Sequence, residues 1–234
     1  MYTVILPAAG TGSRMKLGYN KLFHKIAKRT IIEHTVARFL NDIKCTQIII
    51  VANADDQATM KELFKDHRRV EFITGGPTRQ ESVFEALTHV REDVVMVHDG
   101  ARPFVTSRVI DECYEVASKG YGAISAVIPK DTIKQRHSVN RNFVKQTIDR
   151  NGLAVTQTPQ AFPTVILKKA NELAKNAFLL DLATDDASLV ENFTEIAIKI
   201  VDGAYANIKF TTPEDIKYFE ILMKGVNRHA HRTL

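Results

Sequence analysis

Tryptophan is absent from this 234-residue sequence, and cysteine occurs only twice. Cys45 and Cys113 form neither a CxxC pair nor a ladder of bridges, so a disulfide scaffold is excluded. No apolar run approaches the length that a bilayer-spanning helix needs. From Met1 the chain passes directly into a strand-like pattern, with no leader pattern before it. We therefore expect a protein of the reducing cytoplasm, with no signal peptide and no membrane partner.

The charge balance is modestly positive, with 32 Lys and Arg against 27 Asp and Glu, a net charge of +5. These basic residues are scattered and form no stripe interleaved with aromatic residues, which excludes the usual nucleic-acid surface. A small positive excess instead suits anionic ligands such as nucleotides and sugar phosphates. Hydrophobic residues at 44% and charged residues at 25% are ordinary globular values. We expect residues 1–234 to form one domain.

Five short and almost continuously apolar runs predict strands buried on both faces of a parallel sheet. These runs are Thr3–Leu6, Gln47–Val51, Val70–Ile73, Val94–Val97 and Ala123–Ile128. Helical patterns separate them, at Ile31–Leu40, Gln57–Phe64, Gln80–Val90 and Arg108–Ser118, with Thr30 and Ser107 as N-cap candidates. This alternation predicts an α/β fold with right-handed crossovers and a doubly wound, mostly parallel sheet.

The alternation stops at residues 130–152, which are polar and carry no helical period. Asn140–Asn142 is a turn signal within this segment, so we interpret it as a projecting β-hairpin arm that serves dimerisation. A surface loop explains the same composition equally well. Beyond the arm, the pattern resumes with predicted strands at Leu153–Thr156 and Glu195–Val201. Helices are predicted at Pro163–Ala174 and after Pro213, where Pro at the first turn favours a helix start.

The segment after the first predicted strand, Pro7–Met15, reads PAAGTGSRM and is rich in small residues. Small residues let the backbone approach a ligand, and successive N–H groups can cradle phosphates. A dinucleotide fingerprint would place glycine at Met15 and an acidic residue near Thr30, and a P-loop would end in G-K-[ST]. Neither pattern is present. Arg14 and Lys21 place two cations beside this turn, which suits a polyphosphate whose charge moves during reaction.

Further short motifs follow the turn along the chain: NKLF, GGPTRQES, HDGARP, TPQ, TDDAS, and NIK with TPED. They occupy Asn20–Phe23, Gly75–Ser82, His98–Pro103, Thr158–Gln160, Thr184–Ser188, Asn207–Lys209 and Thr212–Asp215. With AAGTGSRM, these motifs resemble in order, over nearly the whole chain, the 2-C-methyl-D-erythritol 4-phosphate cytidylyltransferases of the non-mevalonate isoprenoid pathway. Ala8-Ala9, where related enzymes carry Gly-Gly, and TDDAS favour this family over the ribitol-5-phosphate cytidylyltransferases.

The resemblance implies a CTP site in which the first turn binds the triphosphate and part of the base. The carbonyls of Ala8 and Gly76 would accept from the amino group that distinguishes cytosine from uracil. Pro77 has no N–H, so a family contact through that amide cannot form here. Without the resemblance, the Gly-Gly pair would be read as a plain turn. The implied CTP-binding residues are Ala8, Ala9, Gly10, Gly12, Gly76 and Ser82.

The resemblance also implies an acceptor site. Asp99 would contact the acceptor hydroxyls or bind Mg²⁺; as a structural residue it would cap a helix or pair with Arg102. His98 is interpreted as structural. The sequence has no His/Cys cluster for a transition metal, so Mg²⁺ held mainly by the CTP phosphates is expected. The implied acceptor-binding residues are Asp99, Arg102, Thr132, Thr158 and Thr184, and the implied catalytic residues are Arg14, Lys21, Arg150 and Lys209.

Arg150 ends the predicted arm, and the resemblance implies that it enters the site of the neighbouring subunit in a homodimer. The expected reaction is in-line attack by the acceptor phosphate on the α-phosphorus of CTP, which releases pyrophosphate and needs no protein nucleophile. The same reaction on ribitol 5-phosphate is one alternative. The other is a nucleotide-sensing or dinucleotide-binding module without transferase activity. The joint presence of Arg14, Lys21, Asp99 and Lys209 argues against the latter.

Overall fold

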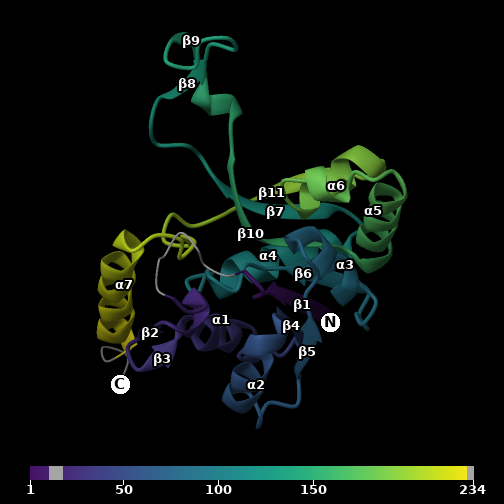
Figure 1. The fold of residues 1–234 in the computed structure, drawn as a ribbon, viewed down its shortest axis with the longest axis vertical. Helices are drawn as coiled ribbons and strands as arrows, with labels where there is room; N and C mark the ends of the chain where they lie inside the picture. Colours follow the sequence, from purple (N-terminus) through teal and green to yellow (C-terminus); the bar gives the residue numbers. More distant parts are fainter. Residues whose placement is uncertain (11–17, 231–234) are drawn as a thin grey trace.

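A seven-stranded sheet forms the centre of the molecule (Figure 1). The computed structural model describes residues 1–10 and 18–230, and only the backbone for 224–230. The strands are β1 (Tyr2–Pro7), β4 (Cys45–Ala52), β5 (Val70–Thr74), β6 (Val94–Val97), β7 (Gly122–Val127), β10 (Val155–Pro163) and β11 (Ile198–Asp202). Their order is β11-β7-β10-β6-β1-β4-β5, and β10 alone among them runs antiparallel to its neighbours. The predicted doubly wound, mostly parallel α/β fold is confirmed.

Helices cover both faces of the sheet because alternate strand residues point to opposite sides. Val4 and Leu6 of β1 join one core with apolar side chains of α1 (Ile31–Leu40), α2 (Ala54–Leu63), α4 (Ser107–Ser118) and α7 (Glu214–Ala230). Ile5 faces the second core, formed with α3 (Arg79–Leu87), α5 (Thr164–Asn176) and α6 (Asp186–Phe193). Two hydrophobic cores therefore pack against opposite faces of the sheet and fix the positions of the strand ends.

The five runs predicted as parallel strands all form strands, and α1 has the predicted bounds. A capping box explains that helix start, because the Thr30 hydroxyl accepts from the Glu33 N–H and the Glu33 carboxylate accepts from Thr30. The prediction of Ser107 as an N-cap was wrong: Thr106 caps α4, and Ser107 is its first residue. Strand β10 extends well beyond the predicted Leu153–Thr156, and α6 was not predicted.

The predicted hairpin is present as β8 (Ile133–Arg136) paired with β9 (Val144–Ile148), and it projects from the body (Figure 1). The side chain of Asn140 accepts from the N–H of Asn142 at 3.2 Å, which forms the turn between the two strands. Three of its apolar side chains, Val139, Phe143 and Val144, are 89%, 65% and 59% exposed. Within the described part of the chain, no helix combines the length and apolar character needed to cross a membrane.

The sheet reverses its winding direction next to β1. From β1 the chain proceeds outward through β4 to β5 and then returns to the other side of β1 as β6. In open α/β sheets such a switch point leaves a crevice beyond the carboxyl ends of the strands, and ligands bind there. Residues 8–10, directly after β1, and residues 99–101, just after β6, line one crevice.

Candidate active site

A cleft of about 310 Å³ occupies this crevice. It contains residues from the turn after β1, the loop after β5, the segment after β6 and the C-terminal segment. The lining includes Ala8, Ala9, Gly10, Lys21, Gly76, Ser82, Asp99 and Lys209. A second cleft, of about 380 Å³, shares Arg79, Asp99 and Lys209 with it. The structure thus brings the predicted nucleotide residues and two predicted cations together; Gly12 and Arg14 lie outside the described residues.

The loop after β5 requires glycine at two positions for steric reasons. A Cβ atom on Gly75 would lie 2.8 Å from the Ala9 Cβ and 2.9 Å from the Ser82 Oγ. A Cβ atom on Gly76 would lie 2.7 Å from the Glu81 Cβ. The loop leads into α3, where the Ser82 hydroxyl donates to the Thr78 carbonyl at 2.8 Å and lies 3.4 Å from the Gly76 carbonyl. Backbone groups of two loops can therefore approach a ligand closely, as base recognition by carbonyl oxygens requires.

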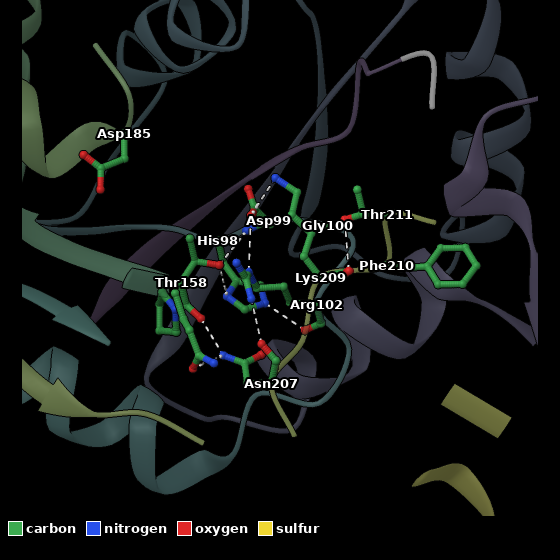
Figure 2. Close-up of polar contacts among 12 residues, drawn as sticks. His98, Asp99, Gly100, Arg102, Thr158, Asp185, Asn207, Lys209, Phe210 and Thr211 are labelled. Carbon is green, nitrogen blue, oxygen red and sulfur yellow. Dashed lines mark hydrogen bonds and ion pairs between the residues drawn. The ribbon is translucent and has the colours of Figure 1, made fainter. Parts of the chain in front are cut away.

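Three cations surround the carboxylate of Asp99, which is buried, and Figure 2 labels two of them, Arg102 and Lys209. The Lys209 Nζ lies 3.0 Å from Oδ2, the Arg102 Nε 3.3 Å from Oδ2, and the Arg79 Nε 3.8 Å from Oδ1. Burial raises the pKa of this carboxyl, but Lys209, Arg79 and Arg102 together hold it well below its usual range. Asp99 is therefore ionised and orients the cations around it.

The backbone of Asp99 is held by a buried relay through Thr158 and His98. The Asp99 N–H donates to the Thr158 Oγ1 at 3.0 Å, and that hydroxyl lies 3.1 Å from the His98 Nδ1. The His98 Nε2 donates to the carbonyl of Arg102 at 3.0 Å, so the neutral ring accepts at Nδ1. Burial lowers the pKa of His98 to about 4. His98 therefore has a structural role, as predicted: its two ring nitrogens hold the turn that carries Asp99.

The C-terminal segment lies along the cleft and connects its parts (Figure 2). Lys21, in the 3-10 turn Lys21–Phe23, donates from Nζ to the Phe210 carbonyl at 2.6 Å. Arg102 donates to the carbonyl of Asn207 at 2.7 Å, and the Asn207 side chain donates to the Thr158 carbonyl at 2.8 Å. The segment that carries Lys209 is thus anchored on both sides of that residue.

Arg150 and Thr132 do not join the cleft of their own chain. Both are exposed at the base of the arm, and the Arg150 guanidinium donates to the carbonyl of Lys130. Thr158 and Thr184 line the second cleft together with Asp185. The structure therefore assembles Lys21 with Lys209 in one cleft, whereas Arg150 lines neither cleft.

The comparisons with known proteins identify the family. The family model for 2-C-methyl-D-erythritol 4-phosphate cytidylyltransferase (IspD) matches residues 2–225. The chain belongs to this family. The Bacillus velezensis enzyme of that name is 44% identical over 228 residues, covering 96% of both chains. The Halalkalibacterium halodurans enzyme is 42% identical over 231 residues, covering 97% of this chain and 99% of that one. The crystal structure of 4-diphosphocytidyl-2C-methyl-D-erythritol synthase from Anaerococcus prevotii superimposes with a TM-score of 0.84 at 29% identity, covering 96% of each.

Membership of the cytidylyltransferase family confirms the predicted resemblance and the predicted enzyme class.

A buried ion pair holds Arg79, a residue that lines both clefts. The Arg79 guanidinium at the start of α3 lies 2.8 Å from Oδ2 of Asp186, whose side chain is fully buried at the start of α6. Burial lowers the pKa of Arg79, but Asp186 and Asp99 raise it more, so the pKa lies above its ordinary value. Both residues lie in motifs noted in the sequence, Arg79 in GGPTRQES and Asp186 in TDDAS, but no local pattern indicated that the two would pair.

Metal ligands are scarce near this site. Across the residues that the structure describes, no three His, Cys, Asp or Glu side chains gather as a metal cluster. Asp99 faces three cations, which makes its carboxylate a poor ligand for a divalent ion unless those cations move away. The donor set around Asp99 therefore does not fit a resident metal ion.

Proposed function

We propose that this chain transfers CMP from CTP to 2-C-methyl-D-erythritol 4-phosphate, giving CDP-methylerythritol and pyrophosphate. The observation that supports this most directly is a single cleft that is lined by Ala8, Lys21, Gly76, Asp99 and Lys209. The relatives reported above carry the methylerythritol 4-phosphate name, which does not favour ribitol 5-phosphate as the acceptor.

In the proposed reaction, an oxygen of the acceptor phosphate attacks the α-phosphorus of CTP in line. A P–O bond to the acceptor forms as the bond to the β-phosphate oxygen breaks, and pyrophosphate leaves with that electron pair. Lys21, together with Arg14, stabilises the charge on the transition state and leaving group. Lys209 holds the attacking phosphate, and Asp99 keeps the Lys209 ammonium directed into the cleft. Positioning and charge stabilisation then carry the catalysis.

We place Mg²⁺ on the phosphates of CTP, as part of the substrate, because Asp99 already faces three cations. We also propose that Asp99 contacts the hydroxyls of the acceptor. Arg102, Thr158 and Thr184 are proposed as further acceptor-binding residues. The Thr158 hydroxyl already serves the backbone of Asp99. Both cysteines are buried free thiols, which is in keeping with the proposed cytoplasmic location.

The arm of residues 130–152 is proposed to pair two copies of the chain and to deliver Arg150 and Thr132 to the partner's site. Exposed apolar side chains on the arm, with Val139 and Phe143 foremost, support a buried role in an assembly. Arg150 supports it too, since this cation lines neither cleft of its own chain and its guanidinium donates to the Lys130 carbonyl within the arm.

The test of this function is pyrophosphate release with CTP and Mg²⁺, with methylerythritol 4-phosphate and ribitol 5-phosphate offered separately. Release with the first acceptor alone is expected. Lys21→Ala should lower kcat by roughly a hundredfold or more with the fold intact, because the charge stabilisation of one preorganised cation is lost. Lys25→Ala, at an exposed lysine nearby, is the control and should retain full turnover. Silence with both acceptors, or normal turnover in Lys21→Ala, would contradict the proposal.

A further inference from the structure

The side chain of Asn20 makes three hydrogen bonds inside the protein and is nearly buried. Its Nδ2 donates to the carbonyl of Ala8 at 3.0 Å and to the Asp56 Oδ2 at 2.8 Å. Its Oδ1 accepts from the N–H of Leu22 at 3.0 Å. Both amide hydrogens and one oxygen lone pair are therefore used, which leaves almost nothing of this side chain unsatisfied.

These partners allow only one orientation of the carboxamide. The Ala8 carbonyl and the Asp56 carboxylate can only accept, and the Leu22 N–H can only donate. A flipped amide would set its oxygen against two acceptors and its NH₂ against a donor. Asp56, in the first turn of α2, anchors the amide from the opposite side.

Asn20 connects two functional groups that are separate along the chain. Ala8 follows β1, is 2% exposed, and donates its own N–H to the Val51 carbonyl at 2.7 Å. Asn20 is the N-cap of the turn that begins with Lys21. One side chain thus fixes the carbonyl at one end of the first turn and the start of the lysine-bearing turn at the other.

A carbonyl oxygen has two lone pairs, and Asn20 engages one of those of Ala8. Ala8 lines the cleft of about 310 Å³, and Asn20 leaves the other lone pair of its carbonyl for a second donor. Cytosine presents an amino donor at this edge, whereas uracil presents an oxygen that would repel the carbonyl. A carbonyl fixed in this way can discriminate, because it cannot rotate away from the wrong base.

We propose that Asn20 is a positioning residue for base selection: it holds the Ala8 carbonyl in the orientation that selects cytosine and couples it to Lys21. The inference rests on the proposed contact between the Ala8 carbonyl and the base. It goes beyond that contact by assigning the selectivity of a backbone group to a side chain that never touches the nucleotide.

The experiment measures kcat/KM with CTP and with the ribonucleoside triphosphate of pyrimidin-2-one, which lacks only the amino group. Asn20→Ser is the informative variant. Serine can still cap the turn through the Leu22 N–H, but it is too short to hold both Ala8 and Asp56. We expect Asn20→Ser to remain folded while the preference for CTP over the analogue falls roughly tenfold, which corresponds to one well-formed hydrogen bond.

Asn171→Ala is the matched control, because Asn171 is also buried and donates to a backbone carbonyl, that of Leu167, at 2.9 Å, but lies in α5 away from the cleft. It should lower the Tm and leave the nucleotide preference unchanged. A normal preference in Asn20→Ser would overturn the role of Asn20 while leaving the base contact in place. If the wild type has the same kcat/KM with both nucleotides, the Ala8 carbonyl does not select the base. That result would overturn both the base contact and the positioning role of Asn20.

Discussion

Replacing Arg79 by glutamine should destabilise the protein far more than an ordinary salt-bridge substitution does. The partner carboxylate of Asp186 is fully buried and lies 2.8 Å from the guanidinium. Breaking such a pair leaves an uncompensated charge in the interior, at a cost of about 3–5 kcal/mol. For a chain of this length, each kcal/mol lowers the Tm by about 2–4 °C. Arg79→Gln should therefore lower the Tm by about 6–20 °C.

The chain offers a matched control in the ion pair between Arg91 and Glu71. Its N–O distance is 2.7 Å, but the two side chains are 67% and 31% exposed. Exposed pairs contribute about 1 kcal/mol or less, so Arg91→Gln should shift the Tm by no more than about 4 °C. Thermal unfolding followed by circular dichroism, with urea unfolding as a second measure, compares the two variants directly.

A third variant separates charge burial from packing. Arg79→Met combined with Asp186→Leu removes both charges at once, so it should be more stable than either single substitution. Equal Tm losses for Arg79→Gln and Arg91→Gln, or a double variant worse than both singles, would refute the reasoning. Because Arg79 also approaches Asp99 at 3.8 Å, kcat/KM should fall in both Arg79 variants.

Three further outcomes follow from the structure. Gly75→Ala should lower the stability by about 1–3 kcal/mol and raise the KM for CTP, because its Cβ would lie 2.8 Å from that of Ala9; Gly152→Ala, with no atom within 4 Å, should leave the Tm unchanged. His98 has a folded pKa of about 4 against 6.5 when unfolded, so the unfolded chain binds the extra proton and stability is lost as the pH falls through this window. The loss reaches ~3 kcal/mol by pH 4. His98→Gln should reduce the difference in the free energy of unfolding between pH 7 and pH 5, measured by urea unfolding. An equal difference in the variant and the wild type would contradict the assignment. Mixing Lys21→Ala with Arg150→Ala subunits should restore about a quarter of wild-type turnover if a twofold dimer shares its sites, since half the dimers are mixed and each has one intact site; no recovery would place Arg150 in its own subunit's site.

Local patterns were sufficient for much of the fold. Apolar runs between helical segments located five strands, because a strand buried on both faces has no polar positions to interrupt it. The bounds of α1 were predictable since the Thr30 and Glu33 capping box lies within four consecutive residues. By contrast, α4 starts one residue earlier than its predicted cap implied, because Thr106 and Ser107 are both good caps and only the packed backbone selects between them.

The sequence by itself determined the family and the strand ends at which the nucleotide motifs lie, since both depend on short segments read in order. The pairing of Asp99 with Arg102, three residues further along the chain, was among the alternatives drawn from the sequence, but only the tertiary structure brought Arg79 and Lys209 to Asp99. Its three cations come from α3, the segment after β6 and the C-terminal segment, and Lys209 is more than a hundred residues away along the chain. The antiparallel direction of β10 and the burial of Asp186 were equally out of reach. Such features depend on which distant segments share a sheet edge, and that is settled by packing of the whole core and by no local pattern.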